Sequence, residues 1–251
     1  MIAFPDALAG MHPLAATTAE RFLMAVDAEL PGLVTGLHVV GSAALDDFVP
    51  GRCDLDFVAV TGWRPDADAL DRLADMHAAM ASTDGAVLDG TYVAAADWPG
   101  PGVEAPAVRA GRFEARSRYR DRPVDSLALA EHALTLRGPP PGWWDVPGVD
   151  GWAAEALRSL RPSADAAEVD EFVLHACRLH YMLALRRIAS KSEAGLYGLI
   201  SFKERWRRIV DEALRLRRSP DAPGLYADAE ERRREALAFV REVARDGLSL
   251  T

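Results

Sequence analysis

The stretch LHVVGSAALDDFVPGRCDLDFVAV, residues 37–60, decides the fold of the first part of the chain. A short apolar segment ends at Gly41-Ser42, and a second apolar segment begins at Asp54-Leu55-Asp56. On a strand, residues i and i+2 point to the same face roughly 6 to 7 Å apart, so Asp54 and Asp56 project together while Leu55 points into the core. Two such carboxylates repel each other unless a cation bridges them. The pattern therefore predicts two strands with a cation site where the second begins.

The residue types in this stretch suit phosphate chemistry. Mg²⁺ prefers a few carboxylates together with substrate phosphate oxygens, and paired metal ions stabilise both the attacking and the leaving oxygens of an in-line phosphoryl displacement. Gly41 lets the backbone approach a phosphate closely, and the Ser42 hydroxyl can donate to its oxygens. The alternative is that Asp54 and Asp56 lie on a solvated strand edge, which is the commoner place for an isolated Asp-x-Asp.

The rest of the pattern predicts two domains. Helical spacing over 17–30 and 66–81 alternates with strand-like segments, including 86–95, which indicates a small mixed α/β sheet. The Pro/Gly-rich stretch 138–142 marks a change of pattern. Beyond it we expect an all-α helical bundle. Its helices are predicted near 152–160, 166–189, 202–217 and 227–246. The predicted boundaries are 1–142 for the α/β domain and 143–251 for the helical domain.

Composition narrows the class of protein. The 251 residues carry a formal net charge of −9, which argues against a nucleic-acid partner and is compatible with a cationic ligand. The longest stretch without Asp, Glu, Lys or Arg, 30–45, is shorter than the ~20 residues needed to span a bilayer. The two cysteines lack zinc-site spacing. We expect a cytoplasmic protein without a membrane span.

Strand, Gly-Ser, loop and a strand bearing Asp-x-Asp together resemble the signature of the DNA polymerase β-type nucleotidyltransferase superfamily. That superfamily commonly has a third carboxylate on a later strand, and Asp89 within 86–95 is the candidate. The resemblance implies that Asp54, Asp56 and Asp89 form the catalytic and Mg²⁺-binding set. Asp89 would be either a metal ligand or the general base that takes the acceptor proton. The alternative is a turn aspartate before Gly90.

Two later segments, 129–140 and 176–195, are similar to those of streptomycin/spectinomycin-type aminoglycoside adenylyltransferases. The resemblance implies a nucleotidyltransferase domain, a C-terminal helical domain and substrates bound between them. It also matches Arg178 and Lys191 to positions that reach the ATP triphosphate, beside the nucleotide-binding Gly41 and Ser42. From the residues alone, Arg178 is the only formally charged residue from 172 to 185 apart from histidines, so it needs a partner, either phosphate or a carboxylate. Lys191 is predicted just past the end of the helix over 166–189, in a Ser-Lys-Ser-Glu turn, where the alternative is a plain surface role.

The family resemblance implies a Mg²⁺-dependent enzyme that transfers AMP from ATP to a hydroxyl of an aminoglycoside or aminocyclitol and releases pyrophosphate. Glu168 and Glu171 are candidate contacts to that acceptor, and we expect a monomer. Two alternatives stay open. One is that the same fold acts on another small molecule or on a protein hydroxyl, and the other is that the chain is an inactive nucleotide-binding module.

The sequence departs from the pattern expected of a streptomycin-modifying member. Such members carry a tryptophan and an aspartate ahead of the arginine-bearing helix, whereas residues 159–165 read SLRPSAD, without a tryptophan. A missing aromatic platform removes a large contact area for a bulky ligand. We therefore predict that spectinomycin or a smaller aminocyclitol is preferred over streptomycin.

Overall fold

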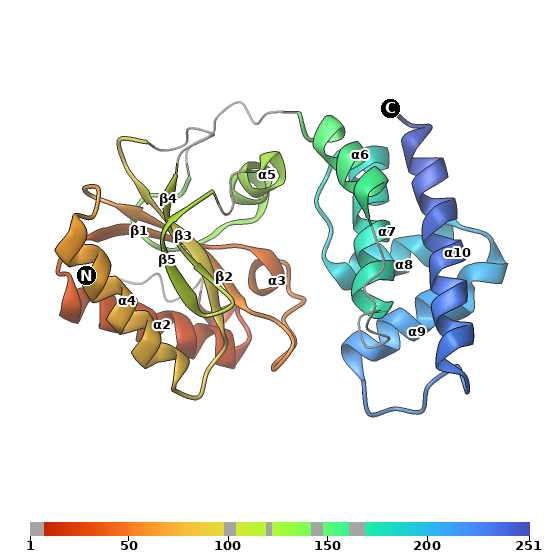
Figure 1. Cartoon of the computed structure of the whole chain (residues 1–251), viewed down its shortest axis with the longest axis horizontal. Helices are drawn as coiled ribbons and strands as arrows, with labels where there is room; N and C mark the ends of the chain where they lie inside the picture. Colours follow the sequence, from red (N-terminus) through yellow and green to blue (C-terminus); the bar gives the residue numbers. More distant parts are fainter. Residues whose placement is uncertain (1–7, 98–103, 119–121, 142–147, 161–168) are drawn as a thin grey trace. The chain divides into compact units, whose positions relative to one another are not determined.

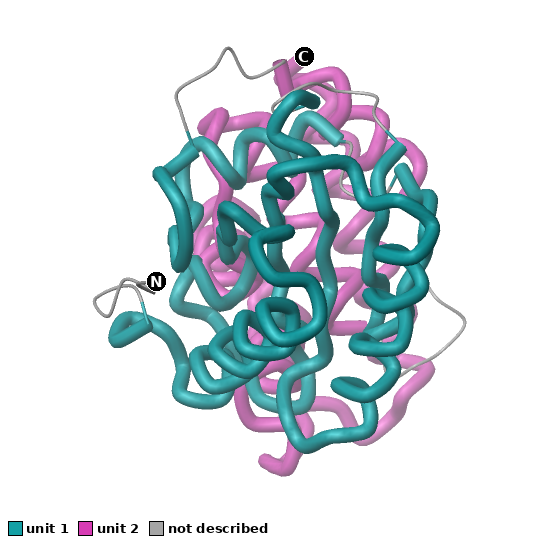
Figure 2. Tube along the Cα trace, turned by 90° about the vertical axis from the view of Figure 1, so that its left-hand side faces the viewer, with its two compact units in different colours: residues 1–147 teal, residues 148–251 magenta. Residues whose placement is uncertain are grey.

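The computed structural model describes residues 8–97, 104–118, 122–141, 148–160 and 169–251. The chain divides into two compact units, 1–147 and 148–251, which are coloured separately in Figure 2. The first is a mixed α/β unit and the second is helical, which confirms the predicted fold class. The predicted boundary at 142/143 falls in 142–147, outside the described residues.

A six-stranded sheet forms the first unit (Figure 1). The strands lie in the order β5-β4-β3-β2-β1-β6, with β2 and β3 parallel and the other neighbours antiparallel. The parallel pair follows from the connection, because β2 and β3 are joined through a helix, as parallel neighbours require. The strands are β1 (Val34–Val39), β2 (Leu55–Thr61), β3 (Leu88–Ala94), β4 (Ala105–Arg109), β5 (Arg112–Ser117) and β6 (Leu134–Arg137).

Helices lie on both faces of this sheet. α2 (Pro13–Glu29) and α4 (Ala67–Ala81) cover one face, and α5 (Pro123–His132) covers the other, as Figure 1 shows. The short α3 (Gly41–Ala44) follows β1 and contacts β2. Both long helices start at recognisable caps. Asp66 accepts a hydrogen bond from the Ala69 N–H at 3.0 Å, and α2 begins with a proline, which suits the first turn.

The larger core lies between α2, α4 and the sheet. Its centre is a group of packed rings, with Phe22 and Phe57 4.8 Å apart and His77 2.6 Å from the Tyr92 hydroxyl. The opposite face has a smaller core in which Leu129 of α5 packs with Val40 and Val58. Because the core on the α5 face is smaller, that face of the sheet has room for polar side chains.

Two buried histidines make the stability of this unit depend on pH. Burial lowers the pKa of His38 and of His77 from 6.5 to about 4, so the folded state excludes a proton that the unfolded chain binds. We expect the free energy of unfolding to be fully developed above pH 6.5 and to fall as the pH drops toward 4, by up to about 3 kcal/mol for each histidine. Denaturant titrations across this range measure it.

His77→Phe should reduce that pH dependence, because it removes one of the two groups while keeping a ring in the aromatic cluster. His12→Asn is the matched control, since His12 is exposed and Asn is also able to cap α2. A free energy of unfolding that stays constant between neutral pH and the acid end of the range would contradict the expectation.

The second unit is built around α7 (Val169–Leu185), which packs against each of the four other α-helices that the structure describes in this unit. Along α7 nearly every residue from Phe172 to Leu183 is buried, as expected of a central helix that is apolar on more than one side. The surrounding helices are α6 (Val149–Ser159), α8 (Lys191–Ser201), α9 (Arg207–Arg218) and α10 (Ala229–Leu248), with the short η2 (Glu204–Trp206) before α9.

Some predicted elements were wrong in extent. The helix predicted over 166–189 is α7 to Leu185, and a separate helix, α8, begins at Lys191. The hairpin of β4 and β5 was not predicted. α5 and β6 were also missed as elements.

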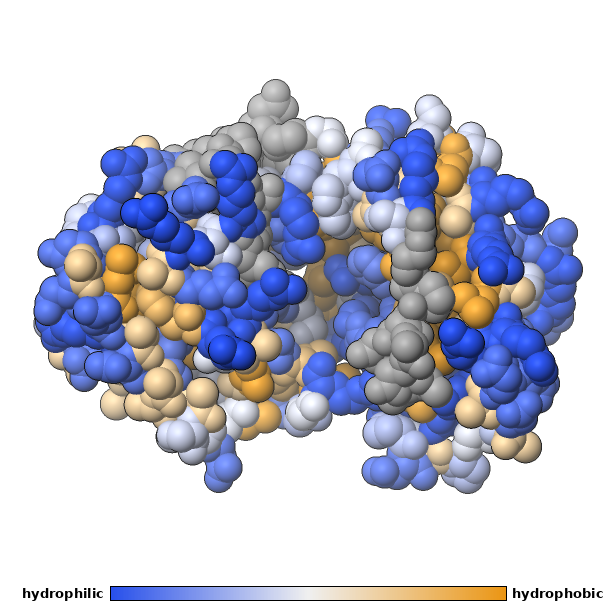
Figure 3. Space-filling view, viewed as in Figure 1, coloured by the Kyte–Doolittle hydropathy of each residue, from blue (hydrophilic) through white to orange (hydrophobic). Residues whose placement is uncertain are grey.

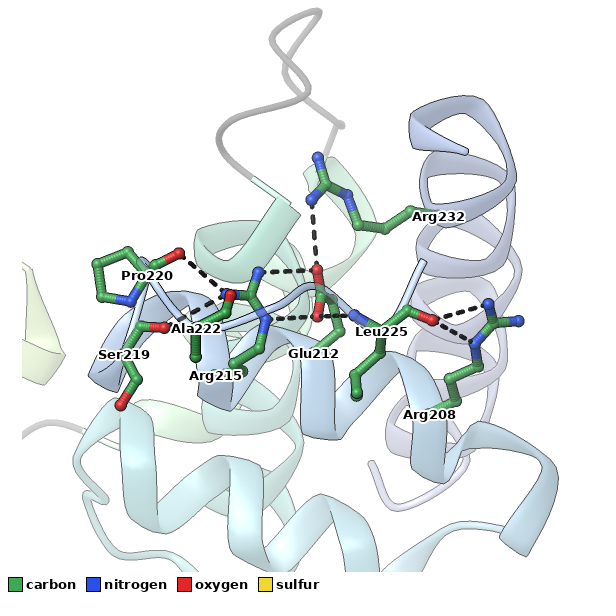
Figure 4. Close-up of polar contacts among 8 residues, drawn as sticks. All are labelled: Arg208, Glu212, Arg215, Ser219, Pro220, Ala222, Leu225 and Arg232. Carbon is green, nitrogen blue, oxygen red and sulfur yellow. Dashed lines mark hydrogen bonds and ion pairs between the residues drawn. The ribbon is translucent and has the colours of Figure 1, made fainter. Parts of the chain in front are cut away.

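The loop between α9 and α10 is held by a buried carboxylate (Figure 4). The Glu212 side chain is fully buried and receives two hydrogen bonds from Arg215, at 2.8 and 3.0 Å, and one from the Leu225 N–H at 3.0 Å. Arg232 of α10 lies 3.4 Å from the same carboxylate. Arg215 also donates to the carbonyls of Ser219, Pro220 and Ala222. These contacts fix the C-terminal end of α9.

The visible surfaces of both units in Figure 3 are largely hydrophilic, with scattered apolar residues. Among the helices of the described ranges, none combines the length and the apolar character that a bilayer span requires.

Candidate functional site

The carboxylates of β2 and β3 lie side by side. Asp56 and Asp89 are register partners in the parallel pair, on the sheet face opposite Leu55, Phe57 and Leu88, which belong to the larger core. Neighbouring strands are about 4.8 Å apart, so paired residues present their side chains together. Asp54 precedes Asp56 by two positions and lies immediately before β2, so alternation places it on the same face. The structure thus places all three predicted carboxylates at the start of β2 and β3.

Gly41 lies directly against one of these carboxylates. Its φ is +67°, and a Cβ atom added at this position would lie 2.0 Å from Asp56 Oδ2. The Val40 N–H donates to the Asp56 carbonyl at 3.0 Å, which joins the end of β1 to β2. Ser42 follows within α3. The glycine is therefore needed both for its backbone conformation and for the space that Asp56 occupies.

Asp89 is held from the other side by the hairpin of β4 and β5. The Ala110 N–H donates to Asp89 Oδ2 at 3.1 Å, and the Gly111 N–H donates to the Leu88 carbonyl at 2.9 Å. Ala110 and Gly111 have φ of +47° and +75°, the two positive values of a tight type I′ hairpin turn. This contact was not predicted from the sequence, because an Ala-Gly pair is a weak turn signal compared with Asn-Gly.

The chemistry of these donors fits Mg²⁺ bound together with a nucleotide. Within the part of the chain that the structure describes, no three His, Cys, Asp or Glu side chains form a group able to hold a metal ion by themselves. Mg²⁺ typically binds through one or two protein carboxylates and completes its shell with phosphate oxygens and water. The adjacent Asp56 and Asp89 supply such a pair. The assignment of Asp54, Asp56 and Asp89 as metal ligands stays a prediction.

Three of the predicted residues of the second unit meet where α7 is followed by α8. Lys191, the first residue of α8, forms an ion pair with Glu171 of α7. The Arg178 Nε donates to the Ala189 carbonyl at 3.0 Å. Ser190 caps α8 by accepting from the Glu193 N–H at 3.1 Å. Arg178, Lys191 and Glu171 are thus close together, although they are up to 20 residues apart in sequence.

This arrangement corrects one prediction and adds a contact. Lys191 is not in a turn but opens a helix, where the N-terminal N–H groups favour anions. The Tyr181 hydroxyl donates to Glu193 Oε1 at 3.3 Å, a contact that the sequence did not indicate. Glu168, the other predicted acceptor contact, lies outside the described residues.

Comparison with known proteins identifies the second unit. A sequence model of the family described as "Aminoglycoside adenylyltransferase, C-terminal domain" matches residues 148–245. The C-terminal unit belongs to this family. The match covers nearly all of the unit that begins at Gly148, and it confirms the family resemblance predicted from the sequence. Among curated proteins, none matches the chain.

A solved structure resembles the chain over both units. It is the spectinomycin adenyltransferase AAD(9) from Enterococcus faecialis, in a crystal structure with ATP and spectinomycin. The TM-score is 0.67 at 12% sequence identity, and the match covers 90% of this chain and 98% of that one. At this identity the likeness shows a shared fold, in the α/β unit as well as in the helical unit.

Proposed function

We propose that the protein transfers AMP from ATP to a hydroxyl of an aminoglycoside or aminocyclitol and releases pyrophosphate. One observation carries the proposal. The unit that precedes an aminoglycoside adenylyltransferase C-terminal domain pairs Asp56 with Asp89 beside Gly41, at the end of a strand. Paired carboxylates next to a glycine that admits a phosphate are suited to phosphoryl transfer rather than to hydrolysis by zinc or to hydride transfer.

In this reaction the acceptor hydroxyl attacks the α-phosphorus, the new P–O bond forms as the bond to the pyrophosphate oxygen breaks, and the hydroxyl proton leaves to a base. Asp89 is the candidate base, and its Oδ2 is oriented by the Ala110 N–H. Ser42 donates to a phosphate oxygen, and Gly41 gives the backbone room to approach it. Mg²⁺ held by Asp54 and Asp56, with Asp89 as a third ligand in the alternative in which it is not the base, would supply charge neutralisation at the phosphates.

The helical unit would bind the rest of the nucleotide. Arg178 and Lys191 are candidates for the triphosphate, since a planar guanidinium and an ammonium group both donate to phosphate oxygens. Their approach to the same short segment, 189–191, supports a shared ligand. Catalysis of this kind depends mainly on positioning and charge stabilisation, which is why residues from several elements would be required.

The acceptor would be cationic. Glu171 and Asp89 offer carboxylates to its ammonium groups, and the net charge of −9 favours approach of a cation at low salt. Two observations favour spectinomycin: residues 159–165 lack the tryptophan expected of a streptomycin-modifying member, and the structural relative was crystallised with spectinomycin.

A panel of acceptors with ATP and Mg²⁺ tests the proposal. We expect mass spectrometry to detect a product heavier by one AMP, with kcat/KM for spectinomycin or a smaller aminocyclitol above that for streptomycin. A kcat/KM that favours streptomycin by about tenfold, or about 1.4 kcal/mol, would overturn the expected order but not the activity. AMP transfer to no member of the panel would contradict the proposed acceptor class, and retained ATP binding would then direct the search to other hydroxyl compounds.

A further inference from the structure

Two glycines bring α8 unusually close to its neighbours. A Cβ atom at Gly195 would lie 2.6 Å from a methyl carbon of Leu214 in α9 and 2.8 Å from one of Leu174 in α7. At Gly198 it would lie 2.9 Å from Cys177 Sγ. Any larger residue would force the helices apart, since these distances are shorter than van der Waals contact. The close packing places the first turn of α8 between α7 and the C-terminal end of α9.

Three basic side chains from three helices meet at that first turn. Arg178 of α7 donates from Nε to the Ala189 carbonyl at 3.0 Å, and Lys191 is part of the turn itself. Arg218, the last residue of α9, donates from Nε to Ser192 Oγ at 3.1 Å. The contacts therefore fall on the consecutive residues 189–192. Lys191 is paired with Glu171, so the two arginines and the N–H groups of the helix start supply the positive potential here, which is electrostatically suited to an anion.

Arg218 differs in its partners from three other arginines of α9. Arg207, Arg208 and Arg215 each form an ion pair with a glutamate. Across the described ranges, Arg218 has no ion pair, and its hydrogen bond to Ser192 uses only Nε. Its side chain is exposed, so the two terminal nitrogens of the guanidinium keep their donors for a ligand.

The position of Arg218 is also fixed by contacts of the helix that carries it. Arg215, one turn earlier, is clamped by Glu212 and donates to the carbonyls that follow the end of α9, as Figure 4 shows. Arg218 is thus held at its backbone by this network and at its side chain by Ser192. A guanidinium that is held in place before binding loses less conformational freedom when it meets a phosphate.

We infer that Arg218 is a third phosphate-binding residue, which acts with Arg178 and Lys191 on the triphosphate of ATP. The inference rests on the proposed function, because that function supplies the nucleotide. A purely structural role for Arg218 would be to balance the dipole at the C-terminal end of α9 and to tether Ser192. Such a role would change the thermal stability of the chain but not its affinity for ATP.

Calorimetric titration of the full chain with ATP and Mg²⁺ separates the two roles. We expect Arg218→Ala to raise the Kd for ATP by roughly tenfold or more, and Arg218→Lys to recover part of the loss. The affinity of Arg218→Ala for inorganic tripolyphosphate, which lacks the nucleoside, should fall by a similar factor. Arg178→Ala and Lys191→Ala serve as comparators. Arg241→Ala on α10 is the matched control, because it removes the same charge from an exposed position of the same unit.

An unchanged Kd for ATP in Arg218→Ala would overturn the inference. An equal rise in the Kd of Arg241→Ala would also overturn it, because the effect would then come from net charge and not from the position of Arg218. If Arg218→Ala lowers Tm as well, Arg218→Lys decides the question: full recovery of Tm with only partial recovery of affinity would support phosphate binding through the guanidinium, and full recovery of both would overturn it. If the unaltered chain binds no ATP, the proposed function itself fails. That result differs from ATP binding that is merely insensitive to Arg218.

Discussion

Asp56→Asn is expected to lower kcat/KM for AMP transfer by on the order of a thousandfold, because a metal ion acting on phosphates contributes several kcal/mol and each 1.36 kcal/mol is tenfold. The substitution keeps the size of the side chain and its place beside Gly41, so it should leave the fold intact. Asp54→Asn is expected to behave in the same way. Initial rates of pyrophosphate release, with and without acceptor, measure the effect.

Asp71→Asn provides the matched control. Asp71 is exposed on α4 and is not one of the predicted site residues, so removal of its charge should leave the rate near that of the unaltered chain. Near-normal turnover by Asp56→Asn would refute the metal assignment. Asp89→Asn adds a further distinction: loss of rate with unchanged ATP affinity would identify a base, and loss of both would identify a ligand.

Glu212→Ala is expected to destabilise the second unit by about 3 to 5 kcal/mol, the range for removing one partner of a buried ion pair. The truncation leaves Arg215 and Arg232, whose side chains are only 14% and 18% exposed, without their shared carboxylate. Burial alone would raise the pKa of Glu212, but hydrogen bonds from Arg215 and Leu225 and the arginine charges hold it below its ordinary value. The carboxylate is therefore charged in the folded protein at neutral pH.

Thermal or denaturant unfolding of the full chain measures this loss. Glu212→Gln should cost less, since its amide oxygen still accepts one hydrogen bond. Glu155→Ala is the control: Glu155 pairs with Arg158 on the exposed side of α6, with both side chains more than half exposed, and its removal should leave Tm unchanged. A Tm equal to that of the unaltered chain in Glu212→Ala would show that the network in Figure 4 contributes little to stability.

Features that depend on residues close together along the chain were the easier ones to predict. Period-two alternation around Asp54 and Asp56 is a local property, and β2 begins at Leu55 as expected. The hairpin of β4 and β5 was missed because β5 is largely exposed and lacks an apolar face, and because Ala110-Gly111 is a weak turn pair. The start of α8 did carry a signal, since Ser190 followed by Glu193 is the S-x-x-E pattern of a helix N-terminus.

The sequence by itself determined the two-part architecture and the residue types available for chemistry, since periodicity and helix or strand preference depend on neighbours along the chain. Only the tertiary structure decided which of those residues meet. The parallel pairing of β2 and β3 sets Asp56 beside Asp89, and the Ala110 N–H orients Asp89 from a hairpin 21 residues away. Likewise the glycines of α8 bring Arg218 to Ser192 across 26 residues of sequence. Contacts of this kind depend on how elements pack, and packing is a property of surfaces that become neighbours only when the chain has folded.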